Sequence, residues 1–265
     1  MKECIKVGLL GAGTVGSGVL TVLEENTAEI EKKVGVPIHV SKILVRDMKK
    51  AKELSEKYQL TDKIEDIVED PEIDIVVELI GREHPAKEYI AAALEHKKNV
   101  VTANKDVLAK YGKELFPLAE ENKVDFMFEA SVGGGIPIIR ALNSSLTADR
   151  IDEVTGILNG TTNYMLTKMF FESADYDEVL KEAQEKGYAE RNPEADVEGH
   201  DACRKIAILT SLIAGQHVDF ETIHTEGITK ITTEDMKYAK TMDMAIKLLA
   251  SSKREGESFS AIVAP

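Results

Sequence analysis

The sequence predicts an α/β protein in which a doubly wound parallel sheet is followed by a smaller α+β region. Short apolar runs alternate with helical patterns along residues 5–128, and this alternation is typical of consecutive βαβ units. It stops at the run SVGGGIP, residues 131–137, after which strands and helices follow a different order. We therefore expect a Rossmann-type domain over residues 1–130 and a smaller α+β domain over residues 131–265.

The expected strands of the first domain are short apolar runs, as suits strands that are buried on both faces. They span residues 5–10, 38–45, 74–80, 99–103 and 124–128. The expected helices have apolar residues at helical spacing and span residues 15–33, 49–58, 85–96 and 113–122. Gly35 is a natural C-terminal cap for the first helix, and Pro85 suits the first turn of the third.

The second domain is expected to mix helices with an antiparallel pair of strands. A strand is predicted over residues 151–158, and helices over residues 161–171, 176–186 and 199–214. The last of these helices carries an apolar stripe along one face. The tail of the chain predicts two strands joined by a turn at residues 253–256.

Composition excludes several classes of function. The 265 residues are 43% hydrophobic and 30% charged, as in ordinary globular proteins, and carry a net charge of −14. This charge opposes binding to nucleic acid or to an anionic membrane, so a small-molecule partner is expected. Two cysteines, Cys4 and Cys203, form no disulfide framework, and no apolar run is long enough for a membrane helix. We expect a cytoplasmic protein.

The segment GAGTVG has the GxGxxG spacing between a predicted strand and a predicted helix. Gly11 permits a tight turn, Gly13 lets the backbone approach a pyrophosphate, and Gly16 allows close helix packing. The helix N-terminus supplies the positive site that an anionic ligand needs. The expected dinucleotide-binding residues are Gly11, Ala12, Gly13, Thr14, Val15 and Gly16. The alternative is a glycine-rich turn that binds no ligand.

The end of the second predicted strand bears on the choice of cofactor. An arginine there accommodates the 2′-phosphate of NADP, whereas a carboxylate holds the ribose hydroxyl of NAD. Arg46 comes first and favours NADP(H), while Asp47 would favour NAD(H) after a shift of one residue. The alternative is a surface charge cluster.

Two further segments are candidates for chemistry. In VVTANK, Lys105 follows a parallel strand at the edge of the sheet where such folds bind ligands. In EASVGGGIP, Glu129 is followed by glycines that can turn several carbonyl oxygens inward, and such an oxygen cage suits a hard cation. A flexible interdomain hinge is the alternative for the second segment.

The segment EKGYAERNPEADVEGHDACRK, residues 185–205, is rich in carboxylates and ends on a lysine. Asp201 and Lys205 lie at i and i+4, on one face of the predicted helix. A lysine held between carboxylates stays protonated and can donate to a developing alkoxide, while Glu190 and Asp196 could bind a substrate ammonium. An acidic loop with an ordinary helix salt bridge is the alternative.

The residues of this segment together resemble the signature of homoserine dehydrogenases. The matching positions are Ala183, Gly187, Tyr188, Ala189, Asn192, Pro193, Asp196, Val197, Gly199, Asp201 and Lys205. The segments GAGTVG, VVTANK, EASVGGGIPIIRAL and GILNGTTNYML extend the resemblance over nearly the whole chain.

The resemblance implies reversible reduction of L-aspartate 4-semialdehyde to L-homoserine with NADPH or NADH, in the pathway to threonine and methionine. It implies that Lys205 is the acid/base, that Lys105 lies close to nicotinamide and substrate, and that Asp201 orients Lys205. Glu190, Asp196 and Asp201 would hold the amino end of the substrate. It further implies a homodimer and a sodium or potassium site formed by Glu129 with backbone oxygens of Val132, Gly134 and Ile136.

Members of this family usually continue beyond the point where this chain stops, at Ala264 and Pro265. The expectation is therefore a C-terminally truncated catalytic region. Two alternatives are kept: another dehydrogenase of the same fold that acts on an amino-acid carbonyl, and a non-catalytic nucleotide-binding fragment.

Overall fold

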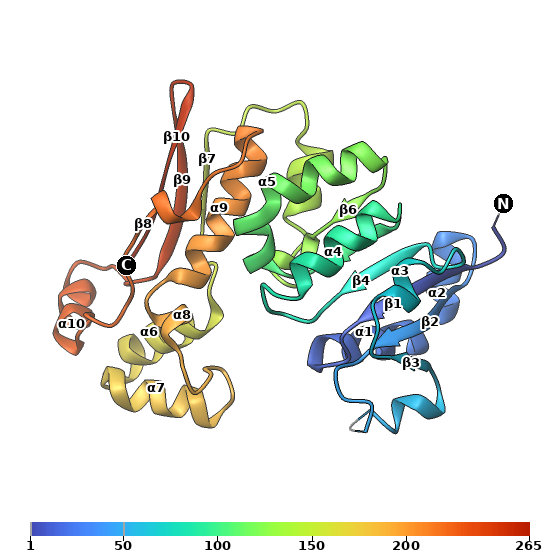
Figure 1. Ribbon diagram of the computed structural model, residues 1–265. Coiled ribbons are helices and arrows are strands. Elements are labelled where there is room, and N and C mark those ends of the chain that lie inside the picture. The colour runs from blue at the N-terminus through green and yellow to red at the C-terminus, as the bar shows by residue number, and fades with distance from the viewer. Residues whose placement is uncertain (1, 50) are drawn as a thin grey trace. The chain divides into compact units, whose positions relative to one another are not determined.

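The computed structural model describes residues 2–49 and 51–265. The chain divides into two compact units, unit 1 (Met1–Pro137) and unit 2 (Ile138–Pro265). Each unit has a sheet of its own, and Figure 1 shows the elements of both.

Unit 1 contains a six-stranded sheet in which all neighbouring strands are parallel. Its order is β3-β2-β1-β4-β5-β6. The strands are β1 (Ile5–Leu10), β2 (Ile38–Leu44), β3 (Gln59–Thr61), β4 (Ile75–Glu78), β5 (Asn99–Thr102) and β6 (Phe126–Met127). The strand order reverses between β1 and β4, so the carboxyl ends of these two strands are where a doubly wound sheet binds its ligand. The predicted Rossmann-type architecture is confirmed.

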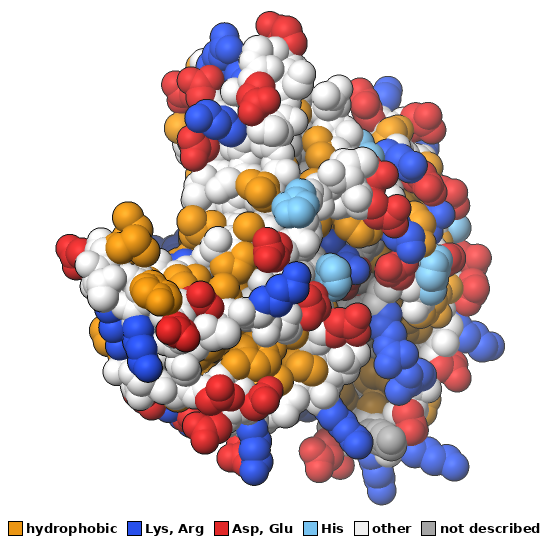
Figure 2. All heavy atoms as spheres, turned by 90° about the vertical axis from the view of Figure 1, so that its left-hand side faces the viewer, with side chains coloured by type: hydrophobic (Ala, Val, Ile, Leu, Met, Phe, Trp, Pro, Cys, Tyr) orange, Lys and Arg blue, Asp and Glu red, His pale blue; other side chains and the backbone are white. Residues whose placement is uncertain are grey.

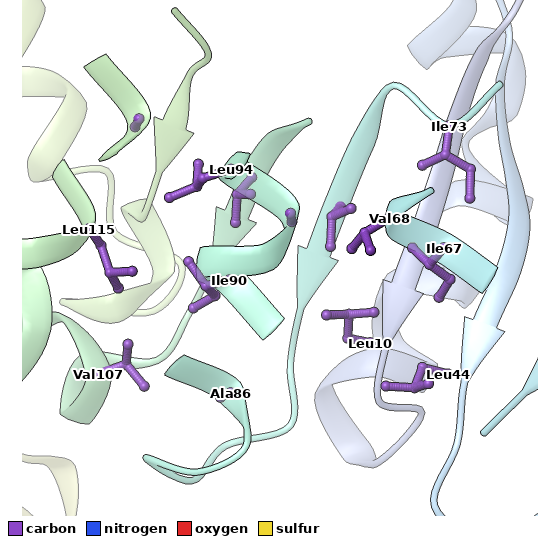
Figure 3. Close-up of a cluster of buried hydrophobic side chains, with 14 residues drawn as sticks. Leu10, Leu44, Ile67, Val68, Ile73, Ala86, Ile90, Leu94, Val107 and Leu115 are labelled. Carbon is purple, nitrogen blue, oxygen red and sulfur yellow. The ribbon is translucent and has the colours of Figure 1, made fainter. Parts of the chain in front are cut away.

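Helices cover both faces of this sheet, as shown by two separate apolar clusters. One cluster joins Leu10 of β1 to α3 (Glu65–Val68), α4 (Ala86–Glu95) and α5 (Lys105–Asn122), and Figure 3 shows it with Ile67 and Ile90 labelled. The other joins Leu9 of β1 to Leu20 of α1 (Thr14–Glu25). Since successive side chains of a strand point to opposite faces, Leu9 and Leu10 anchor the two layers.

The single helix expected over residues 15–33 is two helices, α1 and α2 (Thr27–Val34), which meet at Asn26. Side chains compete with the helical backbone at this point: Asn26 Nδ2 donates to the Val22 carbonyl at 3.1 Å, and Thr27 Oγ1 donates to the Leu23 carbonyl at 2.6 Å. Gly35 ends α2 in the left-handed region, as expected.

The prediction of a helix over residues 49–58 is wrong. The described part of this segment forms turns and one short 3₁₀ helix, η1 (Leu54–Glu56), and residue 50 lies outside the described residues. Ser55 Oγ donates to the Lys52 carbonyl at 2.6 Å, which favours a turn over a continuous helix.

The short elements β3 and α3 were not predicted. Helix α5 begins at Lys105 rather than at residue 113, because the Asn104 side chain accepts from Val107 N at 3.2 Å and caps it.

Unit 2 is a smaller α+β unit, as predicted. Its mixed sheet has the order β7-β9-β10-β8, where β10 is antiparallel to β9 and parallel to β8. The strands are β7 (Glu153–Gly156), β8 (His224–Thr225), β9 (Leu249–Glu255) and β10 (Ser258–Ala264). The helices are α6 (Gly160–Glu172), α7 (Tyr176–Glu185), α8 (Glu194–Val197), α9 (His200–Ala214) and α10 (Thr233–Thr241). Helix α9 packs against β9 and β10, whereas α8, β8 and α10 were not predicted.

The described residues place charged side chains of both signs at the surface. Figure 2 shows acidic side chains interspersed with basic ones over one face of the molecule. Within residues 2–49 and 51–265, no helix has the length and apolar character that spanning a membrane requires.

Candidate active site

The glycine-rich loop of unit 1 connects the carboxyl end of β1 to the start of α1. Gly11 has a φ of +97°, a conformation that residues with a Cβ rarely adopt. A Cβ on Gly16 would lie 2.2 Å from the Gly11 carbonyl oxygen, so the helix can approach the turn only with glycine there. A Cβ on Gly13 would meet no atom within 4 Å. Gly11 and Gly16 are thus required by the fold itself, whereas the space beside Gly13 is open to a ligand.

The first turn of α1 is suited to an anion. Gly13 is its N-cap residue, so no side chain caps the helix, and no acidic residue lies in the first turn. The N–H groups of this turn, which include those of Val15 and Gly16, have no carbonyl partner in the helix and lie at the positive end of its dipole. These features fit the pyrophosphate of a dinucleotide.

A pocket of about 770 Å³ opens beside this loop, entirely within unit 1. Its lining combines backbone of the loop with residues that follow β2 and β4. The polar and charged side chains that line it include Arg46, Asp47, Asp62, Arg82 and His84. The pocket is large enough for a cofactor-sized ligand, and Asp62 and Arg82 are lining residues that the sequence did not single out.

Arg46 and Asp47 both lie on this pocket and are exposed. Strand β2 ends at Leu44, so both residues follow the strand end that normally contacts the adenosine ribose. Asp47 Oδ1 accepts from Lys49 N at 3.1 Å and so closes a local turn. The structure therefore brings both candidates for cofactor discrimination to the same pocket.

A buried polar network lies at the carboxyl ends of β4 and β5. Glu78 is fully buried, and its Oε1 accepts from Ile80 N at 2.7 Å while its Oε2 accepts from Thr102 Oγ1 at 2.6 Å. Thr102 Oγ1 accepts in turn from Asn104 N at 3.0 Å. Lys105 follows as the first residue of α5 and is half-buried. Glu78 was not singled out from the sequence, although a carboxylate inside the apolar run DIVVELI is a signal that could have indicated this network.

In unit 2, Asp201 and Lys205 lie one turn apart on α9, as their spacing predicted. Lys205 Nζ donates to Asp201 Oδ2 at 2.7 Å and to the carbonyl oxygen of Leu158 at 2.8 Å. The side chains retain 9% exposure for Asp201 and 18% for Lys205, so the pair is shielded from bulk water. Shielding from water strengthens such a charged contact relative to one on the surface.

Asn159 connects this pair to Asp196. Its Nδ2 donates to Asp196 Oδ1 at 2.7 Å and to Asp201 Oδ2 at 2.9 Å. The fold thus brings Asp196, Asp201 and Lys205 into one cluster with the loop that precedes α6. Asn159 was not singled out by sequence reasoning, although asparagine before a predicted helix signals an N-cap residue.

Glu190 lies in the loop between α7 and α8 with an exposed side chain, and its backbone carbonyl accepts from Gln184 Nε2 at 3.1 Å. Its substrate-binding role stays a prediction.

The glycine-rich segment after Glu129 turns through left-handed backbone at Gly133 and Gly134, with φ of 81° and 57°. Val132 is buried and Ile136 is exposed. The expected ligands are all oxygen atoms, a chemistry that fits a hard cation. Within the described chain, no cluster of three or more His, Cys, Asp or Glu side chains could hold a metal ion.

The strand order of unit 1, its glycine loop and the adjoining pocket are those of the dinucleotide-binding class of α/β proteins. Residues 11–129 match the profile of the homoserine dehydrogenase NAD-binding domain, and residues 137–265 match the homoserine dehydrogenase profile. The chain belongs to the homoserine dehydrogenase family.

Individual relatives agree with this assignment. The chain is 47% identical to a homoserine dehydrogenase of Bacillus subtilis over 99% of its own length and 61% of that protein. It superimposes with a TM-score of 0.95 on a homoserine dehydrogenase from Thiobacillus denitrificans, at 48% identity, covering 99% of this chain and 61% of that one. A hyperthermophilic archaeal homoserine dehydrogenase in complex with NADPH gives a TM-score of 0.81 at 27% identity, covering 99% and 81%. The chain therefore spans about 61% of the length of the Bacillus relative.

Proposed function

We propose that this chain carries the catalytic region of a homoserine dehydrogenase. It would interconvert L-aspartate 4-semialdehyde and L-homoserine with a nicotinamide dinucleotide, a step toward threonine and methionine. The observation that carries the proposal is the shielded Lys205, held between Asp201 and the Leu158 carbonyl in a cluster with Asp196. Membership of the family supports the choice of substrate.

Lys205 is proposed as the acid/base. Its ammonium group carries three protons, and the contacts to Asp201 and Leu158 use two of them. A third proton can therefore bond the aldehyde oxygen while both contacts persist. The nicotinamide, when bound, supplies the hydride to the carbonyl carbon. Lys205 Nζ gives its proton to the oxygen, which completes the hydroxyl group, and it takes that proton back when homoserine is oxidised.

Asp196, Asp201 and Glu190 are proposed to bind the amino end of the substrate. A substrate ammonium placed near a group of carboxylates is stabilised by charge-assisted hydrogen bonds. Asp201 would also orient Lys205, since its Oδ2 accepts from Lys205 Nζ. Lys105 is proposed to lie near nicotinamide and substrate, because it follows the carboxyl end of β5.

NADP(H) is proposed as the preferred cofactor, with NAD(H) as the alternative. Arg46 on the pocket is suited to a 2′-phosphate, and an archaeal member of the family is known in complex with NADPH. Asp47 on the same pocket is the residue that would favour NAD(H). The loop residues Gly11, Ala12, Gly13, Thr14, Val15 and Gly16 would bind the pyrophosphate in either case.

The remaining features of the proposal rest mainly on the family resemblance. They are a homodimer and a sodium or potassium ion held by Glu129 with backbone oxygens of Val132, Gly134 and Ile136. A cytoplasmic location agrees with two free cysteines, Cys4 and Cys203.

The test is whether the purified protein oxidises L-homoserine with NADP, measured as the increase in NADPH absorbance. We expect Lys205→Ala to abolish turnover and to leave nucleotide binding nearly intact, because Lys205 belongs to unit 2 and the nucleotide pocket to unit 1. Lys181→Ala on the exposed side of α7 is the matched control and should keep full activity. Undiminished turnover in Lys205→Ala would exclude the acid/base role.

The same assay separates the alternatives. A protein that binds NADP but oxidises no amino-acid alcohol would be the non-catalytic fragment. Oxidation of a different amino-acid alcohol in preference to homoserine would indicate another dehydrogenase of this fold.

A further inference from the structure

The side chain of Asn159 uses every hydrogen-bonding position that an amide offers. Its Nδ2 donates to Asp196 Oδ1 and to Asp201 Oδ2, at 2.7 and 2.9 Å. Its Oδ1 accepts from Thr162 N and from Thr162 Oγ1, both at 2.9 Å. An amide has two donor hydrogens and two acceptor lone pairs, so these four bonds satisfy it within the protein. Asn159 is also 5% exposed.

The two donor bonds of Asn159 join carboxylates from different elements. Asp196 lies in the short helix α8, and Asp201 lies in the first turn of α9. Two carboxylates brought this close repel each other, and donors placed between them offset the repulsion. Asn159 therefore bridges Asp196 and Asp201 through its two donor hydrogens.

The position of Lys205 depends on the same short loop in two ways. The carbonyl of Leu158, the residue before Asn159, accepts directly from Lys205 Nζ at 2.8 Å. Asp201 Oδ2 is shared, since it accepts from both Lys205 Nζ and Asn159 Nδ2. A displacement of Asn159 would thus move both oxygens that hold the ammonium group.

We propose that Asn159 is a positioning residue for the reaction: it fixes Asp201, and through Asp201 it fixes the direction in which Lys205 delivers its proton. This inference rests on the proposed function of Lys205. Asn159 is not a substrate ligand, because its donors and acceptors are already used by Asp196, Asp201 and Thr162.

A purely structural role is the competing explanation. Asn159 is the N-cap residue of α6, and loss of such a cap lowers stability by about 1 kcal/mol without affecting chemistry elsewhere. The two roles use different halves of the amide. The cap uses Oδ1, and the contact with the carboxylates uses Nδ2.

Substitution can separate the two halves. Asn159→Ser keeps an oxygen that can cap α6 but lacks the amide donors, and Asn159→Ala lacks both. We expect both variants to lose kcat by about tenfold to a hundredfold with little change in the KM for NADP, since misplaced catalytic groups cost rates of this order. Asn159→Asp keeps the cap and adds a third negative charge, so its kcat should fall at least as far.

The matched control is Asp175→Ala, which removes the exposed N-cap side chain of α7. It should lower the melting temperature and leave kcat unchanged. An unchanged kcat in Asn159→Ser would show that Asn159 acts only as a helix cap, and it would overturn the proposal.

A second readout does not depend on turnover. The rate at which Lys205 reacts with trinitrobenzenesulfonate can be followed by peptide mass spectrometry, and loss of the fixed contacts should raise it severalfold in Asn159→Ser and Asn159→Ala. Asp175→Ala should react like the wild type. A fall in kcat with unchanged labelling would overturn the positioning role in favour of direct substrate contact. If the wild type oxidises no homoserine, the proposed function fails and the labelling alone decides whether Asn159 positions Lys205.

Discussion

Thr102 Oγ1 donates a 2.6 Å hydrogen bond to Glu78 Oε2 across the carboxyl ends of neighbouring strands, and both side chains are buried. The other carboxylate oxygen of Glu78 accepts from Ile80 N, in the loop that lines the pocket of about 770 Å³ in unit 1. Thr102 accepts from Asn104 N, directly before Lys105. This pair therefore links the backbone of the pocket to the backbone that carries Lys105.

Replacing Glu78 with glutamine should weaken this link. Glutamine offers one acceptor oxygen where the carboxylate offers two, so either the Ile80 N–H or the hydroxyl hydrogen of Thr102 loses its acceptor. An unsatisfied buried group costs about 1–3 kcal/mol, and we expect a loss of unfolding free energy in this range together with weaker NADP binding. Urea unfolding and calorimetric titration would measure the two effects.

Glu72→Gln is the matched control, because Glu72 is 67% exposed and pairs with Lys6 at the surface. Its effect on stability should be much smaller, and it should leave NADP binding unchanged. Equal losses in both variants would contradict a special role for the buried carboxylate.

The glycines of the loop make separate contributions that alanine can distinguish. Gly16→Ala would place a Cβ 2.2 Å from the Gly11 carbonyl, so it should lower both stability and NADP affinity. Gly13→Ala meets open space, so it should lower NADP affinity by about tenfold or more while the melting temperature stays near that of the wild type.

Gly18→Ala is the internal control for this series, since Gly18 is exposed on α1 and its added Cβ meets no atom within 4 Å. Alanine is favoured in a helix, so this variant should gain about 0.5–1 kcal/mol of stability and bind NADP normally. Normal NADP affinity in Gly13→Ala would show that the ligand does not approach the backbone there.

Local sequence patterns correctly predicted the structural features that depend on residues close together in the chain. The apolar run of β1, the glycine spacing and the i, i+4 placement of Asp201 and Lys205 all depend on residues close in the chain. The errors also have local causes: hydroxyl and amide side chains at Asn26, Thr27 and Ser55 bond to nearby carbonyls and interrupt helices that apolar periodicity alone would continue.

The polar clusters could not be derived in this way, because their members are distant in sequence. Asn159 reaches Asp196 and Asp201 across 37 and 42 positions, and Thr102 reaches Glu78 across 24. Resemblance to a family marked Asp196, Asp201 and Lys205, and it covered Asn159 within the segment GILNGTTNYML without indicating that the amide contacts these carboxylates. That contact exists only when α6, α8 and α9 have packed together.

The choice between cofactors should depend on Arg46. Arg46→Ala should weaken NADPH binding by about tenfold, which corresponds to about 1.4 kcal/mol, and NADH binding much less, because only NADPH carries the 2′-phosphate. Asp47→Asn is the control on the same pocket and should not weaken NADPH binding. Fluorescence titration with each cofactor would give the ratio of the dissociation constants for NADPH and NADH. An equal loss of affinity for both cofactors in Arg46→Ala would exclude a phosphate-binding role for Arg46.

Glu182 on α7 should contribute to the stability of unit 2 in a pH-dependent way. Hydrogen bonds from Lys168, Lys186 and Tyr164 lower the pKa of Glu182 from 4.5 to about 2. The folded state therefore binds this proton less tightly than the unfolded chain does. The contribution of Glu182 is fully present above a pH of about 4.5 and is lost as the pH falls toward about 2.

Glu182→Gln should accordingly melt at a lower temperature than the wild type at pH 7, and the difference should shrink as the pH is lowered through the range from 4.5 toward 2. Melting curves from circular dichroism over a pH series would measure this difference. Glu185→Gln removes the same charge from an exposed position of the same helix and should follow the wild type at every pH. A difference for Glu182→Gln that stays constant down to the acid limit would show that the bonds from Lys168, Lys186 and Tyr164 do not stabilise the ionised carboxylate.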